Sequence, residues 1–163
     1  MHLHLKNKFL YFKDYKIKCS VGKRGLTKKK VEGDLKTPMG CFNFKLLFYR
    51  PDRIKNITTK LKKIKIKKNY GWCDDTTSPN YNKFIIFPFK KSAEKLYLKK
   101  NFYDLILVLD YNSNPVVKNK GSAIFLHISS KTLSPTRGCL AIKKKDLLKI
   151  LPFITRKTKL FIS

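Results

Sequence analysis

The stretch AIFLHISSKTLSPTRGCLAI, residues 123–142, decides the fold and raises the question of function. It holds two apolar runs of β type, AIFLHI and GCLAI, on either side of a polar loop. His127 lies in the first run, and Cys139 follows Gly138 at the start of the second. If the two runs pair as antiparallel strands, His127 and Cys139 come together across a sheet. The stretch therefore predicts a β-sheet and a place where an imidazole meets a thiol.

Similar short strands, separated by turn residues, are predicted along the rest of the chain. The run DLILVLDY, residues 104–111, is apolar almost throughout, which is typical of a strand at the centre of a sheet. Ile64 and Ile66 alternate with lysines, which predicts an edge strand whose charges discourage edge-to-edge pairing. Further strands are predicted at 15–22, 41–48, 83–89 and 158–163.

Two short helices complete the predicted fold. Residues 143–151 place three leucines on one helical face, and Pro152 lies just past the end, where it stops a helix. Residues 91–100 are the second candidate. With 163 residues, of which 42% are hydrophobic, the chain is long enough and apolar enough to bury a core. We therefore predict one mainly β (α+β) domain over residues 1–163, with mostly antiparallel strands.

The formal net charge of +28 would attract any polyanion. However, 33 of the 38 basic residues are lysine and only five are arginine, whereas proteins that read bases depend on arginine forks. The aromatic residues also form no RNA-stacking motif. We interpret the lysines as a solvated, compositionally biased surface and predict no specific nucleic-acid partner. A selected anion-binding patch is the alternative, which the sequence leaves open.

The sequence gives little support for a membrane span, a secretory signal or a metal site. No apolar run approaches the roughly 18 residues that span a bilayer, and the N-terminus lacks the apolar region and cleavage site of a secretory signal. His2 and His4 are expected at a frayed terminus. The four cysteines are unevenly spaced, with no close pair, so no metal site is predicted. They are Cys19, Cys41, Cys73 and Cys139.

Cys139 has neighbours that suit a nucleophile, which needs a stabilised thiolate, a base and donors for an oxyanion. Arg137 is two residues away and would share a face with the sulfur in an extended segment. Gly138 allows the adjoining N–H groups to approach a substrate closely. His127 is the candidate base. The alternative is a buried structural thiol beside a satisfied histidine, and spacing alone does not decide between them.

The segment SPTRGCLAI with the upstream AIFLH resembles the active-site signature of the L,D-transpeptidase catalytic domain family, the YkuD type. That signature is a His, a loop, Ser or Thr, a variable residue, and Gly-Cys at the start of a strand. The matching residues are His127, Thr136, Arg137, Gly138 and Cys139.

A second, upstream segment, GDLKTPMGCFNF, resembles the TPxGxF segment of the same family. Its matching residues are Thr37, Pro38, Gly40 and Phe42. The segments GWCDDTTSPNYN and SAEKLY resemble those of one bacterial subgroup of the family. Together the resemblance covers roughly residues 15–163.

The resemblance implies a β-sandwich and a cysteine enzyme without a metal or organic cofactor. In such an enzyme Cys139 would attack a peptidoglycan stem peptide and form a thioester, with His127 as base. The N–H groups around Gly138 and Cys139 would hold the oxyanion, and Thr136 would contact the substrate. Two departures from the family pattern bear on substrate choice. Ala141 stands where many members carry arginine, so Arg137 is hypothesised to replace it, and the interval of 12 residues from His127 to Cys139 is short.

The segment GWCDDTTSPNYN supplies further candidate substrate-binding residues. Asp74 and Asp75 would bind the amine of a diamino-acid acceptor, or form turns through their own hydrogen bonds. Trp72 would line the cleft, or pack in the core. The same two alternatives apply to Tyr81.

The resemblance implies an L,D-transpeptidase that cross-links or remodels the cell wall. A hydrolase with the same nucleophile, and a basic binding module with an incidental thiol, are the alternatives. Peptidoglycan stem peptides are the expected partners, with an anionic cell-wall polymer as a second, and the protein is expected to be a monomer. The family's substrate lies outside the cytoplasmic membrane, so the cell envelope or periplasm is expected, although no signal peptide is visible.

Overall fold

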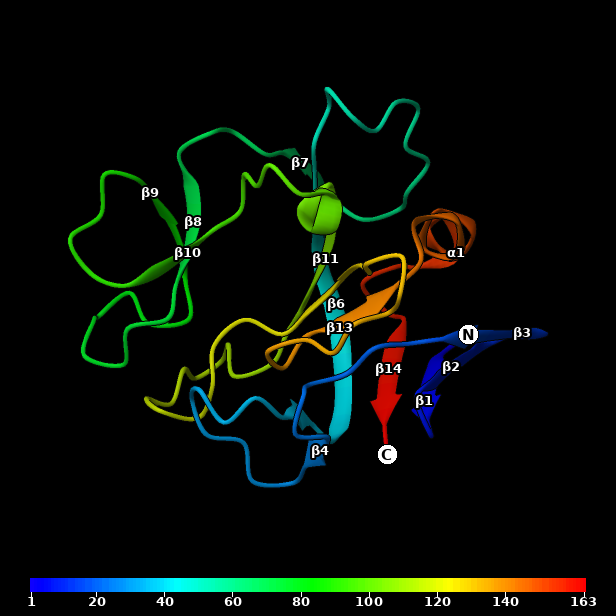
Figure 1. Ribbon diagram of the computed structural model, residues 1–163, viewed down its shortest axis with the longest axis horizontal. Coiled ribbons are helices and arrows are strands. Elements are labelled where there is room, and N and C mark those ends of the chain that lie inside the picture. The colour runs from blue at the N-terminus through cyan, green and yellow to red at the C-terminus, as the bar shows by residue number, and fades with distance from the viewer.

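The computed structural model describes all residues from Met1 to Ser163, and strands dominate it (Figure 1). The elements in chain order are β1 (Leu3–Lys6), β2 (Phe9–Phe12), β3 (Tyr15–Lys18), β4 (Leu26–Thr27), β5 (Thr37–Pro38), β6 (Gly40–Tyr49), β7 (Lys63–Lys65), β8 (Tyr70–Cys73), β9 (Phe84–Ile86), β10 (Ala93–Lys95), η1 (Asn101–Tyr103), β11 (Leu105–Leu109), β12 (Phe125–Ile128), β13 (Leu140–Ile142), α1 (Lys144–Ile150), η2 (Leu151–Phe153) and β14 (Lys159–Ile162). The prediction of a mainly β fold with short helices is confirmed.

Nine strands form one large sheet in the order β13-β12-β11-β6-β14-β1-β2-β3, with β7 paired to β6 beside this path. Most pairs are antiparallel, as predicted, and β11 lies between β6 and β12 near the middle. All five residues of β11 are buried, because both faces of the sheet are covered there. The predicted edge strand is also confirmed, since β7 pairs only with β6.

The large sheet curls until its two ends meet. Ser20, just after β3, exchanges two backbone hydrogen bonds with Ala141 of β13, at N···O distances of 2.8 and 3.0 Å. The opposing parts of this nearly closed sheet face each other across the main core, which is the form that the expected sandwich takes. That core contains 26 buried residues, and α1 covers it with Leu147 and Ile150.

A second, smaller core lies on the other face of the sheet. Alternation along β12 shows the division: Leu126 and Ile128 enter the main core, whereas Phe125 belongs to the second. The three-stranded sheet β10-β8-β9 packs on this face, where Leu96 is fully buried. The candidate site is built on this second face, between the large and the small sheet.

The short helix predicted at residues 91–100 is wrong. Ala93, Glu94 and Lys95 form β10 instead, in register with β8. Pairing with β8 supplies backbone partners that a three-turn helix would have had to provide for itself, so tertiary contacts override local propensity here. The helix predicted at 143–151 is confirmed as α1.

The frayed terminus predicted around His2 and His4 is also wrong. Strand β1 lies between β14 and β2, and its Leu3 is fully buried. His4 stacks on Phe161 with the ring centroids 4.8 Å apart. The N-terminus is ordered because its alternating leucines complete the main core.

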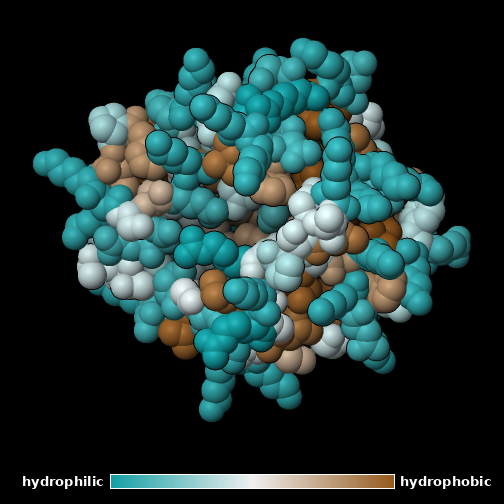
Figure 2. All heavy atoms as spheres, in the orientation of Figure 1, coloured by the Kyte–Doolittle hydropathy of each residue, from teal (hydrophilic) through white to brown (hydrophobic).

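None of the helices is long and apolar enough to cross a membrane. Figure 2 shows hydrophilic side chains spread over the whole visible face, with apolar atoms showing only in small areas between them. This agrees with the interpretation of the lysines as a solvated surface.

Candidate functional site

Strands β12 and β13 are parallel, so the antiparallel pairing predicted for residues 123–142 is wrong. His127 pairs with Ala141, and Leu126 pairs with Leu140. The loop between them is long enough to return to the end where β12 began before β13 starts. Cys139 therefore lies beside Phe125, two positions from His127 along the neighbouring strand and on the same face of the sheet. His127 and Cys139 therefore lie at one site, as predicted, but on parallel and not antiparallel strands.

Both residues line a cavity of about 520 Å³ on the second face of the sheet. Six of the nine site residues predicted from the sequence line it: Asp74, His127, Thr136, Arg137, Gly138 and Cys139.

Trp72, Asp75 and Tyr81 do not line this cavity. Trp72 packs edge-on against Phe125 and donates its indole N–H to Asn82 at 2.9 Å. Asp75 accepts the N–H and the hydroxyl of Thr77, which makes it a turn residue. Trp72 and Tyr81 contact residues near the cavity, namely Phe125 and Glu32, but do not line it themselves. Asp75 forms a turn, which is one of the two roles that the sequence left open for it.

The thiol of Cys139 points along the wall formed by the start of β12. Its Sγ accepts the N–H of Phe125 at 3.4 Å and donates to the carbonyl of Ala123 at 3.6 Å. Burial, with a smaller contribution from the Glu94 carboxylate, raises the pKa of Cys139 to about 12, and the Phe125 N–H and Lys30 oppose the shift. The free protein therefore holds a protonated thiol at neutral pH, which must lose its proton to a base before it can attack.

His127 is in the right ionisation state to be that base. Burial lowers its pKa to about 4, against the opposing effect of the Ile128 and Phe102 carbonyls, so the ring is neutral at pH 7. Its Nδ1 lies 2.9 Å from the Ile128 carbonyl, which can only accept, so Nδ1 carries the hydrogen. The lone pair is then on Nε2. No hydrogen bond joins His127 to Cys139 in the free protein, and such contacts often form only with substrate bound.

A hydrogen-bonded pair of Tyr103, which is buried, and Glu94, which is half-buried, adjoins these two residues, and the sequence analysis missed it. The Tyr103 hydroxyl donates to the Glu94 carboxylate at 2.5 Å. The Tyr103 ring packs edge-on against His127, with centroids 5.2 Å apart. Burial raises the pKa of Glu94. The rarity of carboxylates in this chain could have drawn attention to Glu94. Glu94 was missed because it was predicted in a helix, whereas it lies in β10.

Acidic side chains are concentrated in this cavity despite the basic surface. The chain has ten Asp and Glu residues, and Glu32, Asp74 and Glu94 line the cavity. Glu32 accepts the Tyr81 hydroxyl at 2.6 Å, and Asp74 accepts the Ser92 hydroxyl at 2.6 Å. Lys30 and Arg137 line the same cavity, so its acidic residues outnumber its basic ones by one, and the carboxylates are the groups that can bind a cation such as an ammonium.

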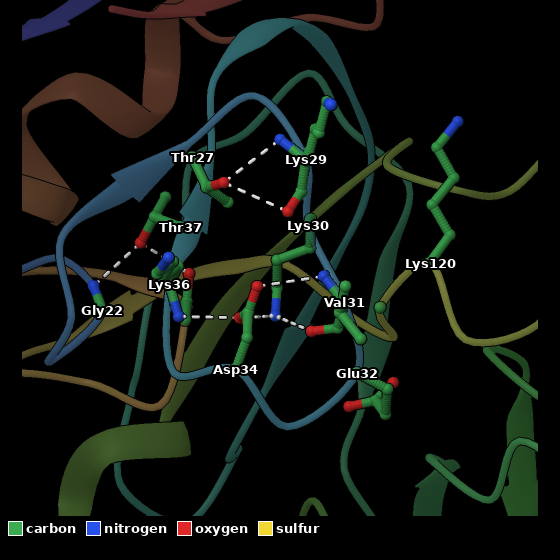
Figure 3. Close-up of polar contacts among 12 residues, drawn as sticks. Gly22, Thr27, Lys29, Lys30, Val31, Glu32, Asp34, Lys36, Thr37 and Lys120 are labelled. Carbon is green, nitrogen blue, oxygen red and sulfur yellow. Dashed lines mark hydrogen bonds and ion pairs between the residues drawn. The ribbon is translucent and has the colours of Figure 1, made fainter.

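The turn that carries Cys139 is held by two threonines. Thr136 Oγ1 accepts the N–H of Gly138 at 3.1 Å and donates to the carbonyl of Cys139. Thr37, from the upstream TPMG segment, donates to the carbonyl of Gly138 at 2.8 Å. It also accepts the N–H of Gly22 at 2.8 Å (Figure 3). The two segments noticed separately in the sequence are thus joined by the Thr37 hydroxyl.

The backbone donors of this turn are not equivalent. The Gly138 N–H is already occupied by Thr136, whereas no loop or side-chain acceptor takes the N–H of Cys139. Of the two donors predicted for an oxyanion, the Cys139 N–H is the one that is free in this structure.

Lys30, and not Arg137, is the buried cation beside the turn. Arg137 lines the cavity with an exposed side chain and makes no side-chain hydrogen bond. The Lys30 side chain is 5% exposed and contacts the Asp34 carboxylate at 2.5 Å and the Val31 carbonyl at 2.9 Å (Figure 3). Lys30 also favours the Cys139 thiolate, the role that the sequence analysis gave to Arg137.

Gly138→Ala is expected to destabilise the protein by about 1–3 kcal/mol. Gly138 has φ +141°, and a Cβ there would lie 3.0 Å from the Lys36 carbonyl oxygen. Urea unfolding measures the change. Gly25→Ala is the control, since Gly25 has φ +82° but open space around it. Equal losses in the two variants would mean that the Lys36 contact adds nothing.

Glu94→Gln is expected to make Cys139 more reactive, because it removes a like charge that disfavours the thiolate. Alkylation by iodoacetamide at pH 8 should be about three- to tenfold faster, since one pKa unit is a factor of ten in thiolate. A Cys41→Ala background removes the exposed thiol. Asp75→Asn, outside the cavity, should leave the rate unchanged. A slower or equal rate in Glu94→Gln would contradict the electrostatic role.

Comparison with protein families gives one match. Residues 4–162 match the model described as YkuD, L,D-transpeptidase catalytic domain. No curated protein sequence is similar enough to the chain to count as a match. The matched range includes the TPMG segment, the acidic wall and the turn that carries Cys139.

Proposed function

The chain belongs to the L,D-transpeptidase catalytic domain family, and from this we propose that it transfers acyl groups of peptidoglycan stem peptides through a thioester on Cys139. The observation that carries the proposal is the placing of Cys139 and a neutral His127 on one face of adjoining strands, at the wall of one cavity. We place this activity in the cell envelope, where its substrate lies.

In the first half of the reaction, Nε2 of His127 takes the Cys139 proton as Sγ attacks the peptide carbonyl. Sγ leaves its contact with the Ala123 carbonyl to do so. The free N–H of Cys139 donates to the developing oxyanion. Collapse of the tetrahedral intermediate breaks the C–N bond, and the His127 imidazolium returns its proton to the leaving amine. A thioester and a free amine result.

In the second half, an amine of a second peptide attacks the thioester, and His127 takes the proton that this amine loses. The new amide forms as the thiolate leaves, and the His127 proton returns to Sγ. If water attacks instead, the same steps give a carboxylate and the protein acts as a hydrolase. The two activities differ only in the nucleophile that reaches the thioester.

The acidic wall supplies a reason for choosing peptides that carry an amine. Glu94 and Asp74 line the cavity beside Cys139, so an ammonium side chain of a diamino acid would be neutralised there. Binding a cation beside Glu94 would also relieve the charge that opposes the Cys139 thiolate. The correct substrate would therefore assist its own attack.

A second role is favoured by the net charge of +28, which suits an anionic cell-wall polymer. Such binding would hold the enzyme near its substrate and would weaken steeply as salt is added. Cys139→Ala should leave it intact. The effect of Cys139→Ala therefore distinguishes polymer binding from the chemistry at the cavity.

The test of the proposed function is intact-protein mass spectrometry after incubation with a carbapenem, whose strained lactam is an acyl donor. Wild type and Cys41→Ala should each gain one drug mass, and Cys139→Ala should gain none. Cys41 is the control because it is the exposed thiol. An adduct that persists in Cys139→Ala, or none on folded wild type with reduced Cys139, would count against the thioester mechanism. Muropeptide assays then separate transfer from hydrolysis.

A further inference from the structure

The hydroxyl of Ser129 is buried in the protein without a hydrogen bond. Ser129 is 7% exposed, and its Oγ has no partner. Leaving a buried hydroxyl unpaired opposes folding. The hydroxyls that follow it along the loop behave differently, because Ser130, Thr132 and Ser134 hydrogen-bond one another. Ser20 is equally buried, at 6%, but donates to the Leu133 carbonyl at 2.7 Å.

Ser129 lies at the cavity, beyond His127 along the same strand line. It continues the alternation of β12, in which Phe125 and His127 face the cavity side and Ile128 faces the main core. Its N–H donates to the Ile142 carbonyl at 2.8 Å, which extends the ladder and fixes its position. Residues two apart on a strand are roughly 6.6 Å apart. Ser129 is therefore about one dipeptide from His127, on the side away from Cys139.

The cavity that Ser129 lines has apolar as well as polar walls. Leu98 and Phe102 line it together with Ser129. Ligand sites are commonly apolar pockets in which a few polar groups fix the orientation of the ligand. A hydroxyl both donates and accepts, so it matches either the N–H or the carbonyl of a peptide group.

We propose that Ser129 is a substrate-binding residue, whose hydroxyl hydrogen-bonds a backbone amide group of the peptide on the side of His127 that is away from the bond that Cys139 attacks. The proposal rests on the proposed function, since it needs a peptide in this cavity. In the free protein the hydroxyl has nothing to lose, so its bond to the peptide is gained entirely on binding. The unpaired hydroxyl thus destabilises the free protein, and the hydrogen bond to the peptide compensates for this in the complex.

The experiment measures affinity and stability on the same variants. Binding of a purified peptidoglycan tetrapeptide is measured by calorimetry in a Cys139→Ala background, where no thioester can form. Adding Ser129→Ala is expected to weaken binding about tenfold, the loss of one hydrogen bond. Ser122→Ala, also on the cavity wall, should leave binding unchanged. Ser129→Ala alone should raise the melting temperature by about 2–4 °C, whereas Ser20→Ala should lower it.

Each outcome decides something. Weaker binding together with a higher melting temperature supports the proposal, because a structural role would move both in the same direction. Unchanged affinity overturns it and leaves the proposed function standing. Weaker binding with a lower melting temperature also overturns it, since Ser129 would then be a structural residue. If Cys139→Ala itself does not bind the tetrapeptide, the proposed substrate is wrong and this inference fails with it.

Discussion

His127→Gln is expected to slow acylation of Cys139 by about 10²–10⁴-fold, the usual contribution of a positioned general base. Burial raises the pKa of Cys139 to about 12, so very little thiolate exists at neutral pH without help. Glutamine keeps an N–H for the Ile128 carbonyl but has no basic nitrogen. The rate is measured in a single turnover, by mass spectrometry of the carbapenem adduct over time.

A rise in pH should separate the loss of the base from damage to the cavity. Acylation of His127→Gln should accelerate as pH rises from 7 to 10, because hydroxide then supplies the thiolate that the imidazole no longer provides. Wild type should gain much less over this range. Tyr103→Phe, which keeps the ring against His127 but loses the bond to Glu94, is the matched control and should stay within about tenfold of wild type. A His127→Gln rate near that of wild type at pH 7 would exclude His127 as the base.

Acidification is expected to cost the protein about 3 kcal/mol through His127 alone, between pH 7.5 and 4.0. Burial lowers the pKa of His127 from 6.5 to about 4 in the folded protein. Between these values the unfolded chain binds a proton that the folded protein does not. Stability is therefore complete above pH 6.5 and is lost as pH falls towards 4.

The contribution of His127 is isolated by comparing two differences. The free energy of unfolding in urea is measured at pH 7.5 and 4.0, for wild type and for His127→Gln. The fall should be about 3 kcal/mol smaller in the variant, because glutamine does not titrate. Asp34 and Asp52, whose pKa values are also lowered, titrate in both proteins and cancel in the comparison. Equal falls would mean that His127 is not held neutral by burial.

Most of the fold was readable from local pattern. Alternating or continuous apolar runs identified β6, β11 and β14, because a strand that buries a face must carry apolar residues at fixed spacing. Three leucines followed by Pro152 identified α1 for the same reason. Strand β10 was missed, because its residues Ala93–Lys95 carry no such pattern and become a strand only by pairing with β8.

The candidate site was readable in part. Through the family resemblance that they carry, the His127 to Cys139 stretch and the separate TPMG segment indicated Cys139 as the candidate nucleophile and His127 as the candidate base. Their joining by the Thr37 hydroxyl was not readable, because residues 37 and 138 are far apart in the chain. The same distance hid Glu94 and Tyr103, which reach the cavity from another part of the chain.

The sequence by itself determined a mainly β core and indicated a candidate nucleophile and a candidate base, because these depend on residue types and motifs within short segments. Only the tertiary structure decided that β12 and β13 run parallel, that Lys30 and not Arg137 is the buried cation near Cys139, and that Glu32, Asp74 and Glu94 gather at one cavity of a basic protein. The physical reason is that pKa values and unpaired groups depend on what surrounds a side chain. Burial in a cavity built from distant segments raises the pKa of Cys139, lowers the pKa of His127 and leaves the Ser129 hydroxyl without a hydrogen bond.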